Sequence, residues 1–94
     1  MDYDEQQKHT MITTLCSVIY TLFDKHADKD STLNEDLGLD SLDRVDILSE
    51  MEEKLGFEDG EIDFTKEQQE KFAQCKTVED LAVFFLEIKN AKLQ

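Results

Sequence analysis

The sequence has no proline, and only two cysteines occur among its 94 residues. Cys16 and Cys75 lie far apart and outside any C-x-x-C pair, so neither a disulfide framework nor a thiolate metal site is indicated. No apolar run approaches the roughly 20 residues that a membrane span requires. The first residues are acidic and polar, with neither the basic start nor the apolar stretch of a secretory signal. We therefore expect a cytoplasmic protein without membrane insertion and without a bound metal.

Repeats, low-complexity tracts and alternating β-branched runs are also absent, which leaves helices as the regular structure that the sequence supports. At this length we expect one domain, residues 1–94, with an all-α fold. The predicted elements are a helix over about 6–26, a loop over 27–40, a helix over about 41–55, a short helix over about 65–73 and a helix over about 78–90. The apolar anchors expected in the loop are Leu33, Leu37 and Leu39.

Apolar residues at spacings of three and four predict the buried face of each long helix. They are Met11, Ile12, Leu15, Ile19, Leu22 and Phe23 in the first helix, Leu42, Val45, Leu48, Met51 and Leu55 in the second, and Val78, Leu81, Phe84, Phe85 and Ile88 in the last. Capping signals agree with this division. Asp40 is a good N-cap, and Thr77 with Asp80 has the spacing of a capping box. Thr65 with Gln68 has the same spacing and predicts the start of the short helix.

Negative charge is concentrated in the middle of the chain. The formal net charge is −13, and residues 34–63 hold 12 acids and 2 bases, a net of −10. Such a field excludes a generic nucleic-acid binder and predicts partners with basic surfaces. The acids do not form a calcium loop, because the residue five places before each glycine of the acidic region is not an acid.

Ser41 stands where the long loop meets the second predicted helix. If Asp40 caps that helix, Ser41 is its first residue, exposed beside the free backbone N–H groups of the first turn. A phosphate esterified there is stabilised by those donors and by the helix dipole. The position suits a serine nucleophile poorly, because neither histidine is close in sequence and no G-x-S-x-G elbow occurs. We therefore predict a phosphodiester anchor in a protein that is not an enzyme and has no catalytic residue.

The run Leu37-Gly38-Leu39-Asp40-Ser41-Leu42 resembles the signature of the acyl carrier proteins, where it opens the second of four helices. The resemblance continues at Asp43, Val45, Asp46, Leu48, Glu52, Glu53, Thr77, Val78, Asp80 and Leu81. It implies a four-helix bundle of the acyl-carrier type, with a long loop between the first two helices and a short third helix. It also implies that a phosphopantetheinyl transferase attaches 4'-phosphopantetheine from coenzyme A covalently to Ser41. The arm then carries an acyl chain as a thioester, in fatty-acid, lipid or polyketide-type biosynthesis.

The neighbours of Ser41 are assigned to the cofactor and partner surfaces. Asp40 and Leu42 flank the arm, and Leu42 offers partners an apolar contact inside a charged rim. The predicted partner face of the second helix comprises Asp43, Arg44, Asp46, Glu50 and Glu53. Its acids are expected to steer the basic surfaces of acyl-loading, synthase and acyl-transfer enzymes towards the arm. Arg44 interrupts them and is expected to tune which partners a monomeric carrier accepts.

Two other functions remain open at this point. One is a peptidyl or aminoacyl carrier, although Asp40 and the heavy negative charge favour acyl cargo. The other is an unmodified helical interaction module that retains the carrier fold. The region 57–74 looks longer than in the common fatty-acid carriers, which leaves the pathway open as well.

Overall fold

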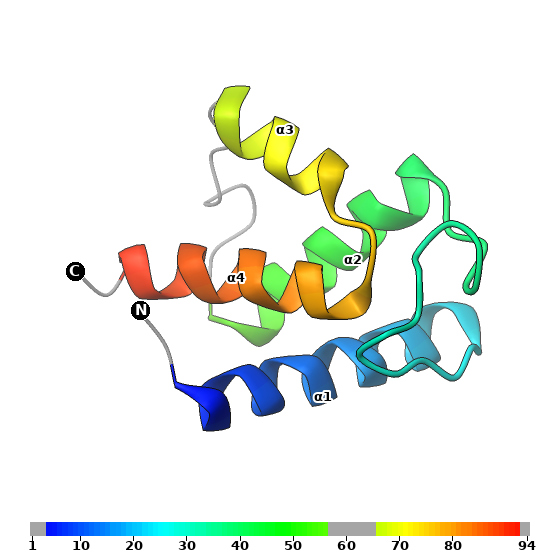
Figure 1. The fold of residues 1–94 in the computed structure, drawn as a ribbon, viewed down its shortest axis with the longest axis horizontal. Coiled ribbons are helices and arrows are strands. Elements are labelled where there is room, and N and C mark those ends of the chain that lie inside the picture. The colour runs from blue at the N-terminus through cyan, green and yellow to red at the C-terminus, as the bar shows by residue number, and fades with distance from the viewer. Residues whose placement is uncertain (1–3, 57–65, 93–94) are drawn as a thin grey trace.

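Four helices make up the regular structure in the computed structural model, which describes residues 4–56 and 66–92 (Figure 1). They are α1 (Glu5–Phe23), α2 (Ser41–Lys54), α3 (Lys66–Gln74) and α4 (Val78–Lys92). No strand occurs within these two ranges, so the predicted all-α class with four helices and a short α3 is confirmed. In the same ranges, no helix has both the length and the apolar character that crossing a membrane demands.

Side-chain and backbone caps set both ends of α1. The Asp4 side chain accepts a hydrogen bond from Gln7 N–H at 2.8 Å, and Asp4 N–H donates to the Gln7 side chain at 3.1 Å. The helix ends at Phe23 and not at the predicted residue 26. The reason is that Asp24 adopts a left-handed conformation, with φ of 57°, and donates its N–H to the Tyr20 carbonyl. Aspartate enters this region more readily than most residues, so the loop begins earlier than the sequence pattern indicates.

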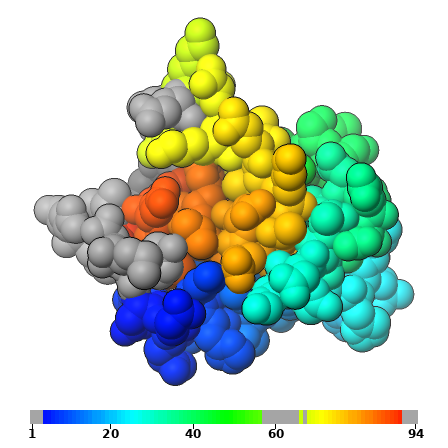
Figure 2. Space-filling view, in the orientation of Figure 1, coloured from blue at the N-terminus to red at the C-terminus, as the bar shows by residue number. Residues whose placement is uncertain are grey.

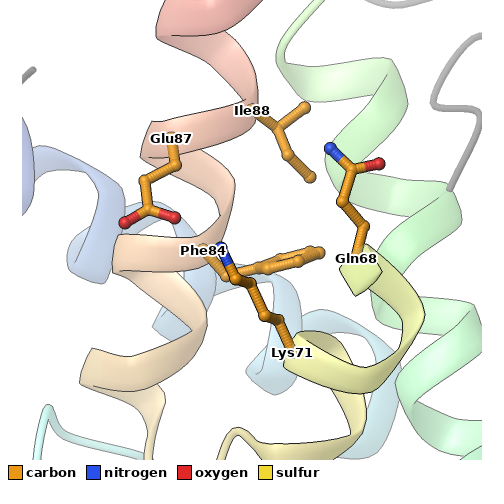
Figure 3. A pocket seen from close by; sticks show the side chains of 5 residues that line it. All are labelled: Gln68, Lys71, Phe84, Glu87 and Ile88. Carbon is orange, nitrogen blue, oxygen red and sulfur yellow. The ribbon is translucent and has the colours of Figure 1, made fainter. Parts of the chain in front are cut away.

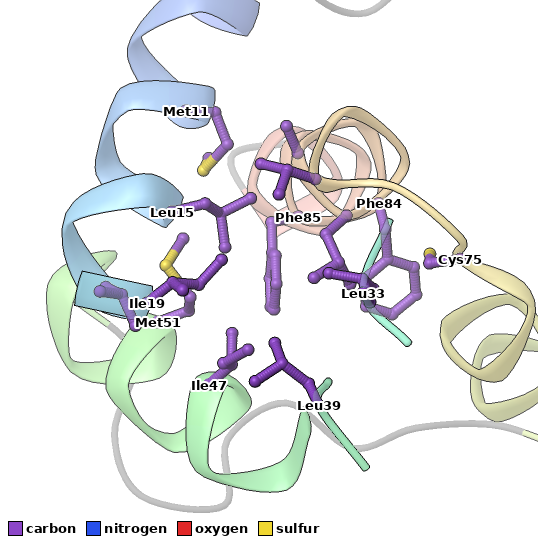
Figure 4. Packing of buried hydrophobic residues seen from close by; sticks show 14 of the residues in the cluster. Met11, Leu15, Ile19, Leu33, Leu39, Ile47, Met51, Cys75, Phe84 and Phe85 are labelled. Carbon is purple, nitrogen blue, oxygen red and sulfur yellow. The ribbon is translucent and has the colours of Figure 1, made fainter. Parts of the chain in front are cut away.

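The core lies between α1, α2, α4 and the long loop (Figure 4). α4 packs against α1, α1 against α2, and α3 against α4. The largest fully buried side chains are Leu15, Val18 and Ile19 of α1, Leu33 of the loop, Ile47 and Met51 of α2, and Val78, Leu81, Phe85 and Leu86 of α4. Figure 4 shows the Phe85 ring at the centre, with Leu15, Leu33 and Ile47 around it. Burial of one such side chain contributes about 1.5–3 kcal/mol.

α2 buries only part of its predicted apolar stripe, and Met51 of that stripe is fully buried. Ile47 is fully buried, whereas Val45 is 51% exposed and Leu42 is 74% exposed. Two residues span about 200° of a helix, so Val45 and Ile47 point in nearly opposite directions. The prediction that Val45 belongs to the buried stripe is therefore wrong. Leu48 and Leu55 of the predicted stripe do pack against the core, partly buried.

The long loop is held to the body of the protein at two places. Its predicted anchors are all buried: Leu33, Leu37 and Leu39. Three backbone hydrogen bonds also join it to the start of α4: Leu33 N–H to Lys76 O at 2.7 Å, Val78 N–H to Ser31 O at 3.1 Å and Glu79 N–H to Lys29 O at 3.0 Å. Thr32 and Thr77 form an isolated antiparallel bridge between the same segments. The loop therefore supplies acceptors to the first turn of α4, whose N–H groups have none within the helix.

The start of α4 carries the predicted capping box. Asp80 N–H donates to Thr77 Oγ1 at 3.2 Å, and Thr77 N–H donates to Asp80 Oδ2 at 3.2 Å. α3 begins at Lys66, and the cap expected at Thr65 lies outside the described residues. Figure 2 shows α3, in yellow, projecting from one edge of the molecule next to α4.

Candidate functional site

The first turn of α2 holds Asp40, Ser41 and Leu42 together at the surface. Asp40 is the N-cap: its Oδ1 accepts from Asp43 N–H at 2.9 Å, and its own N–H donates to Asp43 Oδ2 at 3.1 Å. Ser41 is therefore the first residue of the helix, and its side chain is exposed. Because Asp40 and Asp43 satisfy the cap between them, the Ser41 hydroxyl is not needed for it.

The chain approaches Ser41 through a turn that several contacts hold in place. Gly38 has φ of 64°, a conformation that other residues adopt with strain, and its N–H donates to Asn34 O at 3.1 Å. Lys25 Nζ donates to the Leu37 carbonyl at 2.6 Å. A Cβ on Gly38 would lie 3.4 Å from that ammonium, which is an ordinary van der Waals contact, so the backbone angle and not the space restricts this position. The contact with Lys25 joins the segment just after α1 to the turn that precedes Ser41.

The outward face of α2 combines acids with exposed apolar side chains. Asp40, Asp46 and Glu53 are exposed, and Asp43 and Glu50 are half-buried. Leu42 and Val45 lie exposed on the same helix. The periodicity placed both residues in the buried stripe, whereas the position of Leu42 beside Ser41 predicted the exposure that the structure shows. The first two turns of α2 thus present apolar surface within an acidic surround.

Arg44 does not belong to this outward face. Its side chain is only 8% exposed, and its guanidinium donates to the Phe72 carbonyl at 3.1 Å. Longer contacts of 3.5 Å reach the Ala73 carbonyl and Asn34 Oδ1. The expectation that Arg44 is presented to partners is therefore wrong. The sequence gives no sign of these acceptors, because two of them are main-chain carbonyls 28 and 29 residues along the chain.

Three cavities formed by described residues have linings that do not include Ser41. One, of about 250 Å³, lies beside the long loop and is lined by Thr32, Asn34, Glu35 and Lys76. A second, of about 80 Å³, lies between α3 and α4, where Gln68 and Lys71 face Phe84 and Ile88 (Figure 3). Typical ligand pockets occupy about 300–1,000 Å³, so this cavity is too small for a ligand of ordinary size. The third, of about 510 Å³, is a polar groove beside Lys54, the last residue of α2, about 20 Å along the helix from Ser41. None of these cavities explains binding at Ser41.

Neither of the two thiols is activated for reaction. Burial raises the pKa of Cys75 to about 11, with Asp80 and Glu87 adding to the rise and Arg44 opposing it. Burial also raises the pKa of Cys16, helped by Asp28. Both thiols are therefore protonated at neutral pH and poorly nucleophilic. In the described part of the chain, no group of three or more His, Cys, Asp or Glu side chains is placed to hold a metal ion.

The start of α2 fits a phosphodiester. The backbone N–H groups of a first helical turn have no acceptor within the helix, and the helix dipole places partial positive charge beside them. Ser41 presents its hydroxyl at this end, so an ester formed there brings its phosphate close to the Ser41 and Leu42 amides. The site therefore suits a group that is attached through a phosphate and requires no enclosing pocket.

Comparison with known families agrees with this reading. The family model described as "Phosphopantetheine attachment site" matches residues 10–85, which include the long loop, all of α2 and the first half of α4. No curated protein and no solved structure matches the chain significantly. The match confirms the resemblance that the residues around Ser41 indicate.

Proposed function

This chain belongs to the phosphopantetheine attachment site family, and on that premise we propose that Ser41 is the residue that bears its prosthetic group. The cofactor of the family is 4'-phosphopantetheine, bound covalently. Members of the family are carriers rather than catalysts, and phosphopantetheinyl transferases modify them. In this chain the arm is joined to the Ser41 hydroxyl, and the protein presents the loaded arm to separate enzymes.

The observation that carries the proposal is an exposed serine at a helix start whose cap is already filled. A serine at a helix start commonly serves as the cap itself. Here Asp40 accepts the hydrogen bond from Asp43 N–H, so the Ser41 oxygen remains available to an incoming group. Its exposure admits a transferase without movement of the core.

Ser41 and its neighbours hold the arm without performing chemistry on its cargo. The Ser41 and Leu42 amides and the dipole of α2 stabilise the charge of the phosphodiester. The bound group supplies a terminal thiol, on which an acyl chain is held as a thioester. No described side chain near Ser41 is an activated nucleophile or a paired acid and base, which suits a carrier served by other enzymes.

The acids and apolar side chains exposed on α2 favour a carrier of acyl groups whose partner enzymes have basic surfaces. Asp40 directly precedes Ser41, and Asp46 and Glu53 extend the negative charge along the exposed face. These acids steer enzymes with basic surfaces, while Leu42 and Val45 give the docked enzyme an apolar contact beside the arm. The chain thus serves fatty-acid, lipid or polyketide-type synthesis by delivering acyl intermediates to synthase and acyl-transfer enzymes.

The attachment is tested by incubating the protein with coenzyme A, magnesium and a promiscuous phosphopantetheinyl transferase, followed by intact-protein mass spectrometry. We expect a mass gain of one phosphopantetheinyl group in the wild type and in Ser49→Ala, which removes an exposed serine from the same helix. Ser41→Ala should show none. Modification of Ser41→Ala, or no modification of a folded wild type, would refute the assignment.

The cargo is tested on protein purified from the cells that naturally produce it. The thioester is released with hydroxylamine, and the released group and the protein mass are measured. An acyl group supports the proposal. An amino acid or peptide on the arm would contradict it and favour a peptidyl or aminoacyl carrier.

A further inference from the structure

The guanidinium of Arg44 connects α2 with the long loop, 10 residues earlier in the chain, and with the end of α3, 28 and 29 residues later. We infer that Arg44 is a positioning residue, which keeps the last turn of α3 and the long loop in register with the first turn of α2. The effect of Arg44 on arm transfer rests on the proposed function of Ser41, whereas its role in ordering α3 and the loop does not. Separate measurements test the ordering role and the effect on transfer.

The geometry places one buried cation among three acceptors. Arg44 is 8% exposed, and its Nη1 donates to the Phe72 carbonyl at 3.1 Å and lies 3.5 Å from the Ala73 carbonyl. Its Nη2 lies 3.5 Å from Asn34 Oδ1. The planar guanidinium presents several N–H donors in fixed directions, so one side chain serves two segments simultaneously.

The carbonyls of Phe72 and Ala73 lie in the last turn of α3, where a helix has acceptors without intrahelical donors. The helix dipole also places partial negative charge at this end, which favours a cation. Cys75 N–H donates to the same Phe72 carbonyl at 3.3 Å. Arg44 is therefore a C-cap for α3 that is supplied by another helix.

Asn34 extends the connection to the turn before Ser41. The Asn34 side chain accepts from Arg44, and its carbonyl accepts from Gly38 N–H at 3.1 Å. The Arg44 backbone belongs to the first turn of α2, where its N–H donates to the Asp40 carbonyl at 3.1 Å. Arg44 thus contacts the turn that leads into Ser41 from one side and α3 from the other.

Phe72 contributes two contacts that hold the C-terminal turn of α3. Its ring packs on Phe84 and Phe85 of α4, with centroid distances of 5.4 and 6.5 Å, and its carbonyl is held from α2 by Arg44. α3 has nine residues and projects from the edge of the molecule (Figure 2). A helix this short is marginal without tertiary contacts. Loss of the Arg44 contact should therefore increase the local unfolding of α3 and of the long loop, while α1 and α4 stay ordered.

The affinity of a docking enzyme depends on the fraction of carrier molecules in which the loop and α3 are ordered. If a transferase binds the arrangement in which the loop and α3 are ordered, its apparent affinity falls in proportion to the fraction of molecules that hold that arrangement. The chemistry at Ser41 is unchanged once the complex has formed. Removing the guanidinium should therefore raise the KM for this protein as a substrate and leave kcat nearly constant.

The structural claim is tested by hydrogen exchange followed by mass spectrometry on wild type, Arg44→Met, Arg44→Lys and Lys54→Met. The last is a matched control, because it removes one positive charge from an exposed position on the same helix. We expect peptides covering 66–76 and 31–39 to exchange at least about ten-fold faster in Arg44→Met, with α1 unchanged. Arg44→Lys should fall in between, because an ammonium keeps the charge but does not reach both acceptors at once.

Three results would overturn the structural claim: α3 exchange within two-fold of wild type in a folded Arg44→Met, equal acceleration in all helices, or loss of folding in both Arg44 variants. The last two would mean that Arg44 supports the whole fold and not one segment.

The functional consequence is tested by steady-state modification kinetics with coenzyme A and the transferase. We expect the KM to rise at least three-fold in Arg44→Met, to recover in part in Arg44→Lys, and kcat to stay within two-fold. A fall in kcat at constant KM, or unchanged values of both, would contradict the positioning role. A wild type that accepts no arm would refute the proposed function and leave the exchange experiment to decide on Arg44.

Discussion

Replacing Asp40 by alanine should destabilise the protein by about 1 kcal/mol, because it removes the N-cap of α2. Two hydrogen bonds between Asp40 and Asp43, of 2.9 and 3.1 Å, close the capping box. The alanine loses the acceptor for Asp43 N–H, but both residues lie near water, which replaces part of that bond. The cost therefore lies within the range of about 0.5–2 kcal/mol measured for such caps. For a chain of 94 residues, 1 kcal/mol lowers the melting temperature by about 5 °C.

Asp40→Asn separates the hydrogen bond from the charge. Asparagine keeps the side-chain acceptor and, like alanine, removes one negative charge from a chain with a formal net charge of −13. Urea unfolding of the three proteins should place Asp40→Asn within a few tenths of a kcal/mol of wild type and Asp40→Ala clearly below both. If Asp40→Ala is as stable as wild type, the cap contributes nothing. If the two variants lose equal stability, charge at the start of α2 matters and the hydrogen bond does not.

Three further predictions address other parts of the molecule. Urea unfolding should show that Ile47→Ala lowers the free energy of unfolding by about 2–5 kcal/mol and Val45→Ala by less than about 0.5 kcal/mol, because of the two only Ile47 is buried. Equal losses in the two variants would mean that α2 turns a different face to the core. Reversing the exposed charges with Asp46→Lys and Glu53→Lys should slow arm transfer several-fold at low salt and less at high salt, and a rate insensitive to both changes would contradict steering. Because burial raises the pKa of Cys75 from 9.0 to about 11, the unfolded chain loses this proton first. The free energy of unfolding should therefore fall as the pH rises from about 9 through 11, and a decline of the same size in Cys75→Ala would show that other groups cause it.

The sequence predicts those features that depend on residues close together in the chain. The capping box of Thr77 and Asp80 spans four residues, and the structure contains it as predicted. The loop anchors also follow from the sequence, because Leu33, Leu37 and Leu39 are apolar residues in a segment otherwise rich in turn formers. The exposed position of Ser41 follows from Asp40 as the N-cap. These local signals were sufficient to identify the candidate attachment site.

Two of the features that the sequence did not predict depend on distant partners. α2 carries apolar residues at Val45, Ile47 and Leu48, so its sequence fits two overlapping stripes, and only packing into the shared core selects the one with Ile47. Arg44 looks like a surface charge because its acceptors are main-chain carbonyls of a helix much further along the chain. The end of α1 is a local exception: Asp24 adopts a left-handed conformation there, and the sequence has no glycine at this position to indicate it.

The hydrogen bonds between the long loop and the start of α4 have a consequence for the stage of translation at which the chain can be modified. Ser41 leaves the ribosome well before Lys76, Val78 and Glu79, whose backbone groups bond with the loop. Until those residues have been translated, the loop lacks these three bonds and the turn into α2 is incompletely supported. A growing chain is therefore expected to become a good transferase substrate only when residues 76–79 have emerged from the ribosome, so that unfinished polypeptides escape being charged with the arm.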